Sequence, residues 1–206
     1  MVRRGHHALE IGKRQVAIEQ RADVLGQLGK SVASAMAHTG GCDDRLSAAT
    51  EPEVAAFRDA WLGVPDELTG HPGDAYLAVR RVMTATEPLL AAVKRRQEEE
   101  IAMTYGDNVI PKMVTDKHQR ELARSSDALY VTGLELLASF YRDVAAAQFG
   151  AEVQNTDVGV TSLTQILPAT AVRNADRVLD AIAALQANQR PQLALAALFV
   201  DLGIDA

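Results

Sequence analysis

The feature that most constrains the fold is a long stretch of helical periodicity from Thr115 to about Gly150, which no proline interrupts. Apolar residues recur in it at spacings of three, four and seven: Leu122, Leu129, Leu136, Leu137, Phe140, Tyr141, Val144 and Ala147. Such spacing places apolar side chains along one side of an α-helix. At 1.5 Å per residue, a continuous helix over this stretch would be about 50 Å long. A helix of this length predicts a spine on which other helices pack.

Other segments also show helical periodicity. Residues 15–38 form one such segment, and residues 75–105 form another, in which Pro88 is expected to kink or break the helix with Thr86 as a new cap. Shorter helices are expected from Thr50-Glu51-Pro52 to Leu62, over 161–167, over 169–186 and from Pro191 onward. The only strand candidate is the weak alternation Ala8-Leu9-Glu10-Ile11. The sequence therefore predicts an all-α helical bundle.

Composition and charge restrict the class of protein. Hydrophobic residues make up 48% of the 206 residues and aromatic residues only 4%, which favours helices packed through small aliphatic side chains. The net charge of -6 argues against a broadly basic surface for nucleic acid. Cys42 is the single cysteine, so no internal disulfide forms and a reducing cytoplasm is the expected compartment. No apolar run approaches the length needed to span a membrane.

The first residues do not resemble the start of a domain. Residues 1–7 are basic, yet the apolar region of a signal peptide does not follow them. We therefore expect that the chain was cut from a longer protein.

No residue pattern predicts a catalytic centre, a cofactor site or a metal site. The histidines are His6, His7, His38, His71 and His118, and they form neither an HExxH motif nor an i, i+4 pair. The run Glu98-Glu99-Glu100 is expected to be a solvated helix face, with Arg95 and Glu99 in an i, i+4 salt bridge. Phosphate-binding glycine motifs and a GxSxG nucleophile motif are absent.

Two groups of charged residues leave alternatives open. Lys94-Arg95-Arg96, with Arg80 and Arg81, could contact phosphates, but the glutamates that follow favour an ordinary surface. Arg142 and Asp143 lie within the apolar part of the long stretch. They fit a solvent-facing seam better than an ion pair between subunits, although such a pair would set partner choice.

Two segments, taken in order and about 50 residues apart, resemble a known family. The first is ASFYRDV at 138–144, followed by Gly150 and Asn155, and the second is ANQRPQLALAAL at 187–198. They are similar to the C-terminal collar domain of the delta-prime subunits of bacterial DNA polymerase III clamp loaders. The family pattern is matched at Asn188, Pro191, Leu193, Ala194, Leu195 and Leu198, whereas Arg190 and Ala196 depart from it.

A third segment resembles the end of the family's AAA+ lid domain. It runs from Ala35 to Glu53, in which Gly40-Gly41 and the helix start at Thr50 match the pattern while Cys42-Asp43-Asp44 departs from it. The resemblance implies a lid remnant over 1–63 and a helical collar domain over 64–206. The nucleotide fold, the zinc module and the arginine finger of a complete subunit are absent from this sequence.

The resemblance implies a function without catalysis. The subunit would be a stator in the pentameric ring that loads the sliding clamp, and so part of the DNA polymerase III holoenzyme but not an enzyme by itself. Its partners would be the gamma/tau and delta subunits, with DNA contacted only through the complex and with no cofactor, metal or membrane. Expected subunit-interface residues are Phe140, Tyr141, Arg142, Asn188, Pro191 and Leu195.

Two other classes of function remain open. A free-standing helical ligand-binding or regulatory protein would need polar groups converging in an apolar cavity. A helical DNA-binding regulator is disfavoured by the acidic net charge and by the lack of a recognition-helix pattern.

Overall fold

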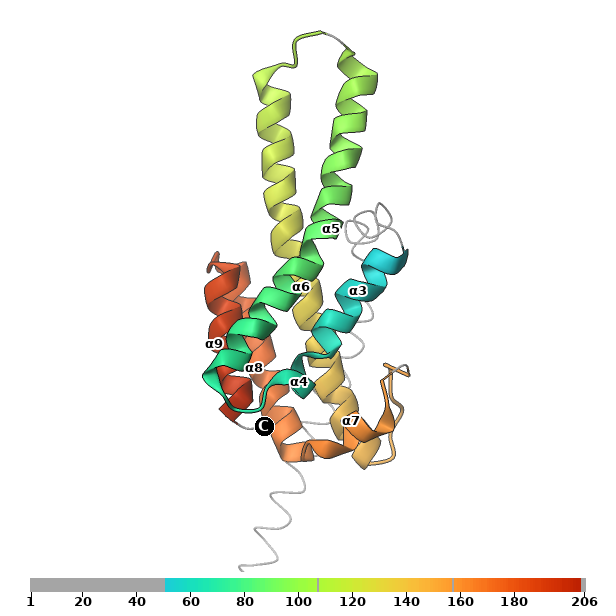
Figure 1. The fold of residues 1–206 in the computed structure, drawn as a ribbon, viewed down its shortest axis with the longest axis vertical. Helices are drawn as coiled ribbons and strands as arrows, with labels where there is room; N and C mark the ends of the chain where they lie inside the picture. Colours follow the sequence, from blue (N-terminus) through green and yellow to red (C-terminus); the bar gives the residue numbers. More distant parts are fainter. Residues whose placement is uncertain (1–50, 107, 157, 205–206) are drawn as a thin grey trace, which may run out of the picture. The chain divides into compact units, whose positions relative to one another are not determined.

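The computed structural model describes residues 51–106, 108–156 and 158–204, and every regular element in these ranges is an α-helix (Figure 1). The helices are α3 (Glu51–Leu62), α4 (Val64–Glu67), α5 (Pro72–Tyr105), α6 (Lys112–Gln148), α7 (Val160–Gln165), α8 (Pro168–Gln186) and α9 (Pro191–Ile204). The predicted all-α bundle is therefore confirmed. The helix expected over 15–38 and the strand candidate at 8–11 lie outside the described residues.

Helix α6 is the predicted spine. It packs most extensively on α8 and also packs on α3, α5 and α7. Its second half is buried, since Leu134, Leu137 and Val144 are each 0% exposed. In its first part, from Lys112 to Arg124, His118 alone is buried. The second half of the helix therefore forms part of the core, and its first part extends away from the core.

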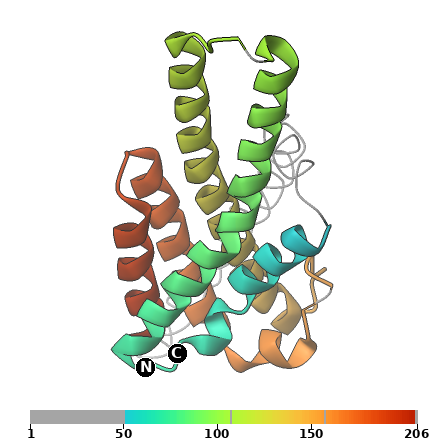
Figure 2. The same cartoon turned by 45° about the horizontal axis from the view of Figure 1, so that its top comes forward.

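Helices α5 and α6 form an antiparallel hairpin whose far end projects beyond the other described helices (Figures 1 and 2). We call residues 94–124 the arm. Among the described residues of the arm, only Gln97 on α5 and His118 on α6 are buried, while Ile101, Val114 and Leu122 are partly buried, so the most buried part of the seam is polar. The Nε2 of Gln97 donates to the carbonyl oxygen of His118, at 3.5 Å, and to the carboxylate of Glu121, at 3.4 Å.

Pro88 does not break α5. The helix continues from Pro72 to Tyr105 with Pro88 inside it. Thr86 caps no new helix, because its side chain is buried and its Oγ1 donates to the carbonyl oxygen of Val82 at 2.7 Å. A proline inside a helix removes one backbone hydrogen bond and bends the axis. Figures 1 and 2 show α5 changing direction near its middle, as expected for a kink.

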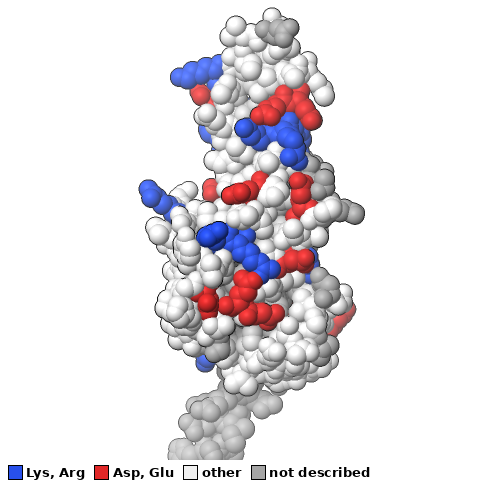
Figure 3. All heavy atoms as spheres, in the orientation of Figure 1, with Lys and Arg blue, Asp and Glu red and all other residues white. Residues whose placement is uncertain are grey.

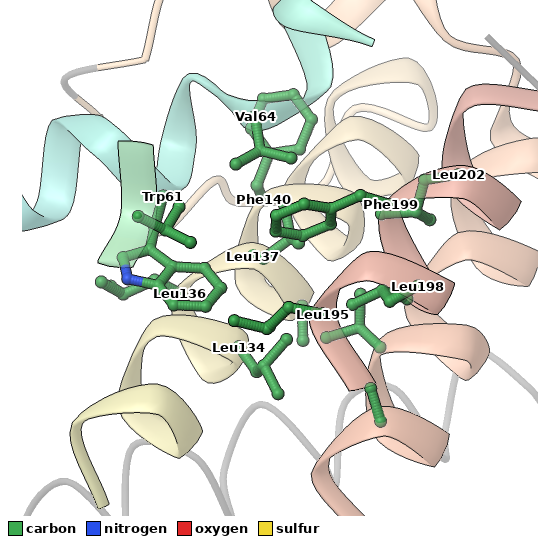
Figure 4. Packing of buried hydrophobic residues seen from close by; sticks show 14 of the residues in the cluster. Trp61, Val64, Leu134, Leu136, Leu137, Phe140, Leu195, Leu198, Phe199 and Leu202 are labelled. Atoms are coloured by element: carbon green, nitrogen blue, oxygen red, sulfur yellow. The ribbon is translucent and has the colours of Figure 1, made fainter. Parts of the chain in front are cut away.

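The core lies where α3, α5, α8 and α9 meet the second half of α6. Figure 4 shows Trp61 approaching from one side of this core and Phe199 from the other. Their ring centroids are 6.4 Å apart in an edge-on arrangement. Gly133 of α6 lies directly under Trp61, since a Cβ at that position would be 1.9 Å from Cε2 of the indole. The missing side chain therefore makes room for the largest aromatic group of the core.

Two helices end in the same kind of turn. After α6, Gly150 has a φ of +69°, and the N–H of Ala151 donates to the carbonyl oxygen of Ala146 at 2.9 Å. After α8, Asn188 has a φ of +64°, and the N–H of Gln189 donates to the carbonyl oxygen of Ala184 at 3.0 Å. This is the Schellman arrangement, in which glycine or asparagine takes the left-handed position.

The described helices all belong to one compact unit of the chain. Helix α3 packs on α5 and α6 in this unit and buries Phe57 and Trp61. The expected boundary at residue 63 would separate α3 from the helices on which it packs. Among the described residues, no helix combines the length and the apolar character that crossing a membrane requires.

Candidate assembly surface

Helix α9 is apolar over most of its surface, with Gln192 and Asp201 as its polar side chains. Its buried face consists of Ala194, Leu195, Leu198, Phe199 and Leu202, which complete the core. Asp201 is its only charged residue. An outer helix of a globular protein normally carries charged and polar residues on the face away from the core. The opposite face of α9 is therefore a candidate functional surface.

That opposite face carries an exposed apolar stripe. Leu193, Val200 and Ile204 are 58%, 45% and 72% exposed, and Ala197 between them is exposed as well. We call Leu193, Ala197, Val200 and Ile204 the α9 stripe. Its spacings of four, three and four are those of a seam along which one helix packs on another. Exposed apolar residues that line up in this way mark an interaction site more often than scattered ones do.

A groove runs beside the α9 stripe, between α8 and α9. It has a volume of about 190 Å³ and is lined by Arg177, Asp180, Ala181, Ala184, Gln189, Ala194, Ala197, Leu198 and Asp201. Ala197 belongs to both the groove and the stripe. The Arg177 guanidinium at the groove donates to the carbonyl oxygen of Asp201 at 2.9 Å. The alanines along the groove permit close approach of a second helix, because their small side chains leave space for a row of side chains on that helix.

The structure places the predicted interface residues in two different settings. Phe140, Tyr141 and Leu195 are 1%, 2% and 0% exposed, so their side chains contact only other parts of the same chain. Burial also raises the pKa of the Tyr141 hydroxyl. Asn188 is exposed and turns the chain, and Pro191 begins α9 as expected. The sequence predicts Leu195 of α9 as an interface residue, and its side chain faces the core. The exposed residues of the α9 stripe were not among the predicted interface residues.

Arg142 and Asp143 belong to a network within the chain. The carboxylate of Asp143 is 0% exposed and accepts hydrogen bonds from Nε of Arg142, at 3.0 Å, and from the backbone N–H of Asn155, at 2.7 Å. It also accepts from Nδ2 of Asn155 at 2.7 Å and from the backbone N–H of Gln154 at 3.1 Å. Both expectations for Asp143, a solvent-facing seam and an ion pair between subunits, are therefore wrong.

The same network reaches α3. The Nδ2 of Asn155 also donates to Oγ of Ser139 at 3.0 Å, and its Oδ1 accepts from the guanidinium of Arg58 at 2.7 Å. Asn155 is 4% exposed and thus joins the loop after α6 to both α6 and α3. The FYRD stretch accordingly has a structural role, which is to hold this loop. Arg142 remains partly exposed, and its place at a subunit interface stays a prediction.

The charged residues of α5 pair differently from the prediction. The Nζ of Lys94 lies 3.6 Å from the carboxylate of Glu98, and the guanidinium of Arg95 lies 3.9 Å from that of Glu53 on α3. The predicted pair of Arg95 and Glu99 is not found among the described residues. Arg81 forms an ion pair with Glu67 of α4. The run of basic residues is therefore interrupted by acidic partners, which weakens the case for a phosphate-binding patch.

Metal-ligating groups do not cluster in the described part of the chain. Its His, Asp and Glu side chains form no group that could hold a metal ion. His6, His7, His38 and Cys42 lie outside the described residues. Comparison with protein-family models, with curated proteins and with solved structures finds no match for this chain.

Proposed function

We propose that the described helices form an assembly domain, and that this domain is the collar of a clamp-loader subunit of the delta-prime kind. The α9 stripe is the observation that carries the proposal. A helix that is buried on one face and apolar on its exposed face favours association with a partner, because covering exposed apolar area stabilises a complex.

The resemblance of residues 138–155 and 187–198 supports the identity of that partner. In a clamp loader, collar domains of several subunits pack side by side into a ring. The proposed role is that of a non-catalytic stator, which holds the gamma/tau and delta subunits in place while the sliding clamp is loaded on DNA. DNA would be contacted only through the complex, in the cytoplasm.

The α9 stripe changes which residues we propose for the contact with the neighbouring subunit. The inward residues Phe140, Tyr141 and Leu195 support α9 from below, while Leu193, Val200 and Ile204 on its outer face would meet the neighbour. Stable assemblies are built around apolar contacts with a polar rim. Here the rim would be supplied by Asp180, Gln189 and Asp201 at the adjacent groove.

A pull-down tests the proposal. The whole chain, Val200→Glu and Val109→Glu are each co-expressed with the gamma/tau and delta subunits of the same organism. Val200→Glu places a charge in the middle of the α9 stripe and should reduce co-purification at least about tenfold, because a buried unpaired carboxylate opposes association. Val109 is 91% exposed at the tip of the arm, so Val109→Glu serves as the matched control and should bind as the natural chain does. Failure of the natural chain to bind, or unchanged binding by Val200→Glu, contradicts the proposal.

A further inference from the structure

Helix α5 carries a second exposed face, and half of the residues on it are charged. Positions 77, 80, 84, 87, 91, 94, 98 and 102 follow one another at spacings of three and four, and all of them are exposed. We call these residues the α5 stripe: Leu77, Arg80, Thr84, Glu87, Ala91, Lys94, Glu98 and Ala102. From Leu77 to Glu98 the stripe extends about 32 Å along the helix.

The charges alternate in sign along this stripe. Arg80 is followed by Glu87, then by Lys94, and then by Glu98. Figure 3 shows blue and red areas in turn along the face of the molecule that α5 crosses in Figure 1. The small Ala91 lies near the middle of the stripe, where a second helix could approach closely.

We propose that the α5 stripe binds a second copy of this chain, with the two α5 helices antiparallel and their midpoint near residue 89. In this register Arg80 of one copy lies opposite Glu98 of the other, and the reciprocal contact forms as well. Glu87 of one copy lies within one turn of Lys94 of the other. Each interhelical pair of opposite charge therefore occurs twice, as a two-fold interface requires.

Charge complementarity selects the antiparallel arrangement. A parallel two-fold pair would place Arg80 against Arg80 and Glu98 against Glu98, and like charges across an interface oppose association. A parallel pair shifted by one heptad would match opposite charges, but it has no closed symmetry and would continue as a filament. The antiparallel register matches opposite charges and closes as a dimer.

The ends of the stripe fit this register too. A groove of about 440 Å³ lies between α3 and α5 and is lined by Ala56, Ala60, Leu77, Arg80, Arg81, Thr84 and Ala85. In the antiparallel register Ala102 of the second copy lies opposite the Leu77 end of this groove. Met103 beside it is 86% exposed and can fill an irregular apolar space, because its side chain is flexible. The contact thus has two apolar ends and a charged middle.

This inference goes beyond the proposed function, since it rests on α5 and not on the α9 stripe. Sedimentation equilibrium of the purified whole chain measures the dimer dissociation constant at low and at high salt. We expect a dimer that weakens as salt rises, because the pairs are solvent-accessible at their rim. A chain that stays monomeric at every protein concentration and salt overturns the proposal.

Charge reversal tests the register. Arg80→Glu and Glu98→Arg each place like charges opposite one another twice, so each should raise the dissociation constant at least about tenfold. The double variant R80E/E98R restores opposite charges and should bring the constant back to within about threefold of the natural value. Glu99→Arg is the matched control, because this exposed neighbour lies off the stripe, and it should leave the constant unchanged. Equal effects of Glu98→Arg and Glu99→Arg, or no recovery in the double variant, contradict the register.

A cysteine pair separates antiparallel from parallel dimers. In a Cys42→Ser background, Ala91→Cys lies near the two-fold axis and should form a disulfide between copies on mild oxidation. Ala102→Cys lies at the far end and should not, whereas a parallel dimer would join Ala102→Cys to itself. Val200→Glu should still dimerise, so loss of clamp-loader binding and loss of self-association are separate results.

Discussion

At the scale of single residues, the contact between Gly133 and Trp61 shows how one missing side chain sets a helix spacing. A Cβ at position 133 would lie 1.9 Å from Cε2 of Trp61, whose side chain is 0% exposed. Gly133→Ala should therefore displace α3 or α6. Overpacking of this kind costs about 1–3 kcal/mol, while alanine in a helix gains up to about 1 kcal/mol over glycine. The free energy of unfolding measured in urea should fall by about 1–2 kcal/mol.

Gly203 provides the matched control for this substitution. It is also a buried helical glycine, but the nearest atom to an added Cβ is 3.7 Å away. Gly203→Ala should leave the protein as stable or slightly more stable. Equal losses for the two variants would mean that Trp61 is not the cause.

Sequence patterns predict such a contact poorly. Trp61 and Gly133 are recognisable as an apolar residue and an isolated helical glycine, but the fit between them depends on how α3 and α6 approach each other. By contrast, the turn at Asn188 and the helix start at Pro191 were predictable, because local backbone chemistry decides both.

At the scale of elements, Asn155 fastens the loop after α6. Asn155→Ala removes the hydrogen bonds to Arg58, Ser139 and the carboxylate of Asp143. The backbone N–H of residue 155 still donates to Asp143, so the buried carboxylate keeps part of its partners. Loss of buried hydrogen bonds with partners left behind costs about 1–3 kcal/mol each, which predicts a clear drop in the unfolding temperature by calorimetry.

The neighbouring residue separates this network from the loop in general. Gln154 contributes its backbone N–H to Asp143, and its side chain is exposed. Gln154→Ala should therefore unfold at the same temperature as the natural protein. If both variants unfold alike, the side chain of Asn155 does not hold the loop.

The elements themselves were largely predictable, and their faces were less so. Helical periodicity located α6, α8 and α9 closely, since apolar spacing reflects burial directly. Leu195 was expected at the interface because of the resemblance of residues 187–198, and a resemblance along the sequence does not distinguish the inner face of α9 from its outer face. The near absence of charged residues in α9 could have indicated that both of its faces are covered, one by the core and the other by a partner.

At the scale of the whole molecule, the spatial arrangement could not be read from local patterns. The sequence suggested that α3 belonged with the preceding residues, yet it shares a core with α5, α6 and α9. The expected boundary at residue 63 came from the order in which segments that resemble the lid and collar domains follow one another in the sequence. Which helices share a core depends instead on contacts between residues far apart in the sequence. The same reason hides the network of Asp143, because its partners Gln154 and Asn155 follow it by more than ten residues.

The molecule should also differ in stability between its core and its arm. The core half of α6 is covered by several helices, whereas the arm consists of two helices that pack on each other across Gln97 and His118. Regions with few buried apolar contacts open at lower free energy than the core. In native-state hydrogen exchange, the helical amides of residues 94–105 and 112–124 should therefore exchange much faster than those of residues 129–145, although all three segments are helical.

A single substitution in the arm makes this expectation specific. The Nδ1 of His118 is buried without a hydrogen-bond partner among the described residues, which costs about 1–3 kcal/mol. His118→Leu removes that cost and should slow exchange in the arm about fivefold or more, because about 1 kcal/mol changes an opening equilibrium by that factor. Exchange in residues 129–145 should stay unchanged. The exposed Gln119 next to it supplies the control, since Gln119→Leu adds the same side chain outside the seam and should not slow exchange. Arm amides as protected as the core, or equal effects of the two leucines, would show that the polar seam does not limit the arm.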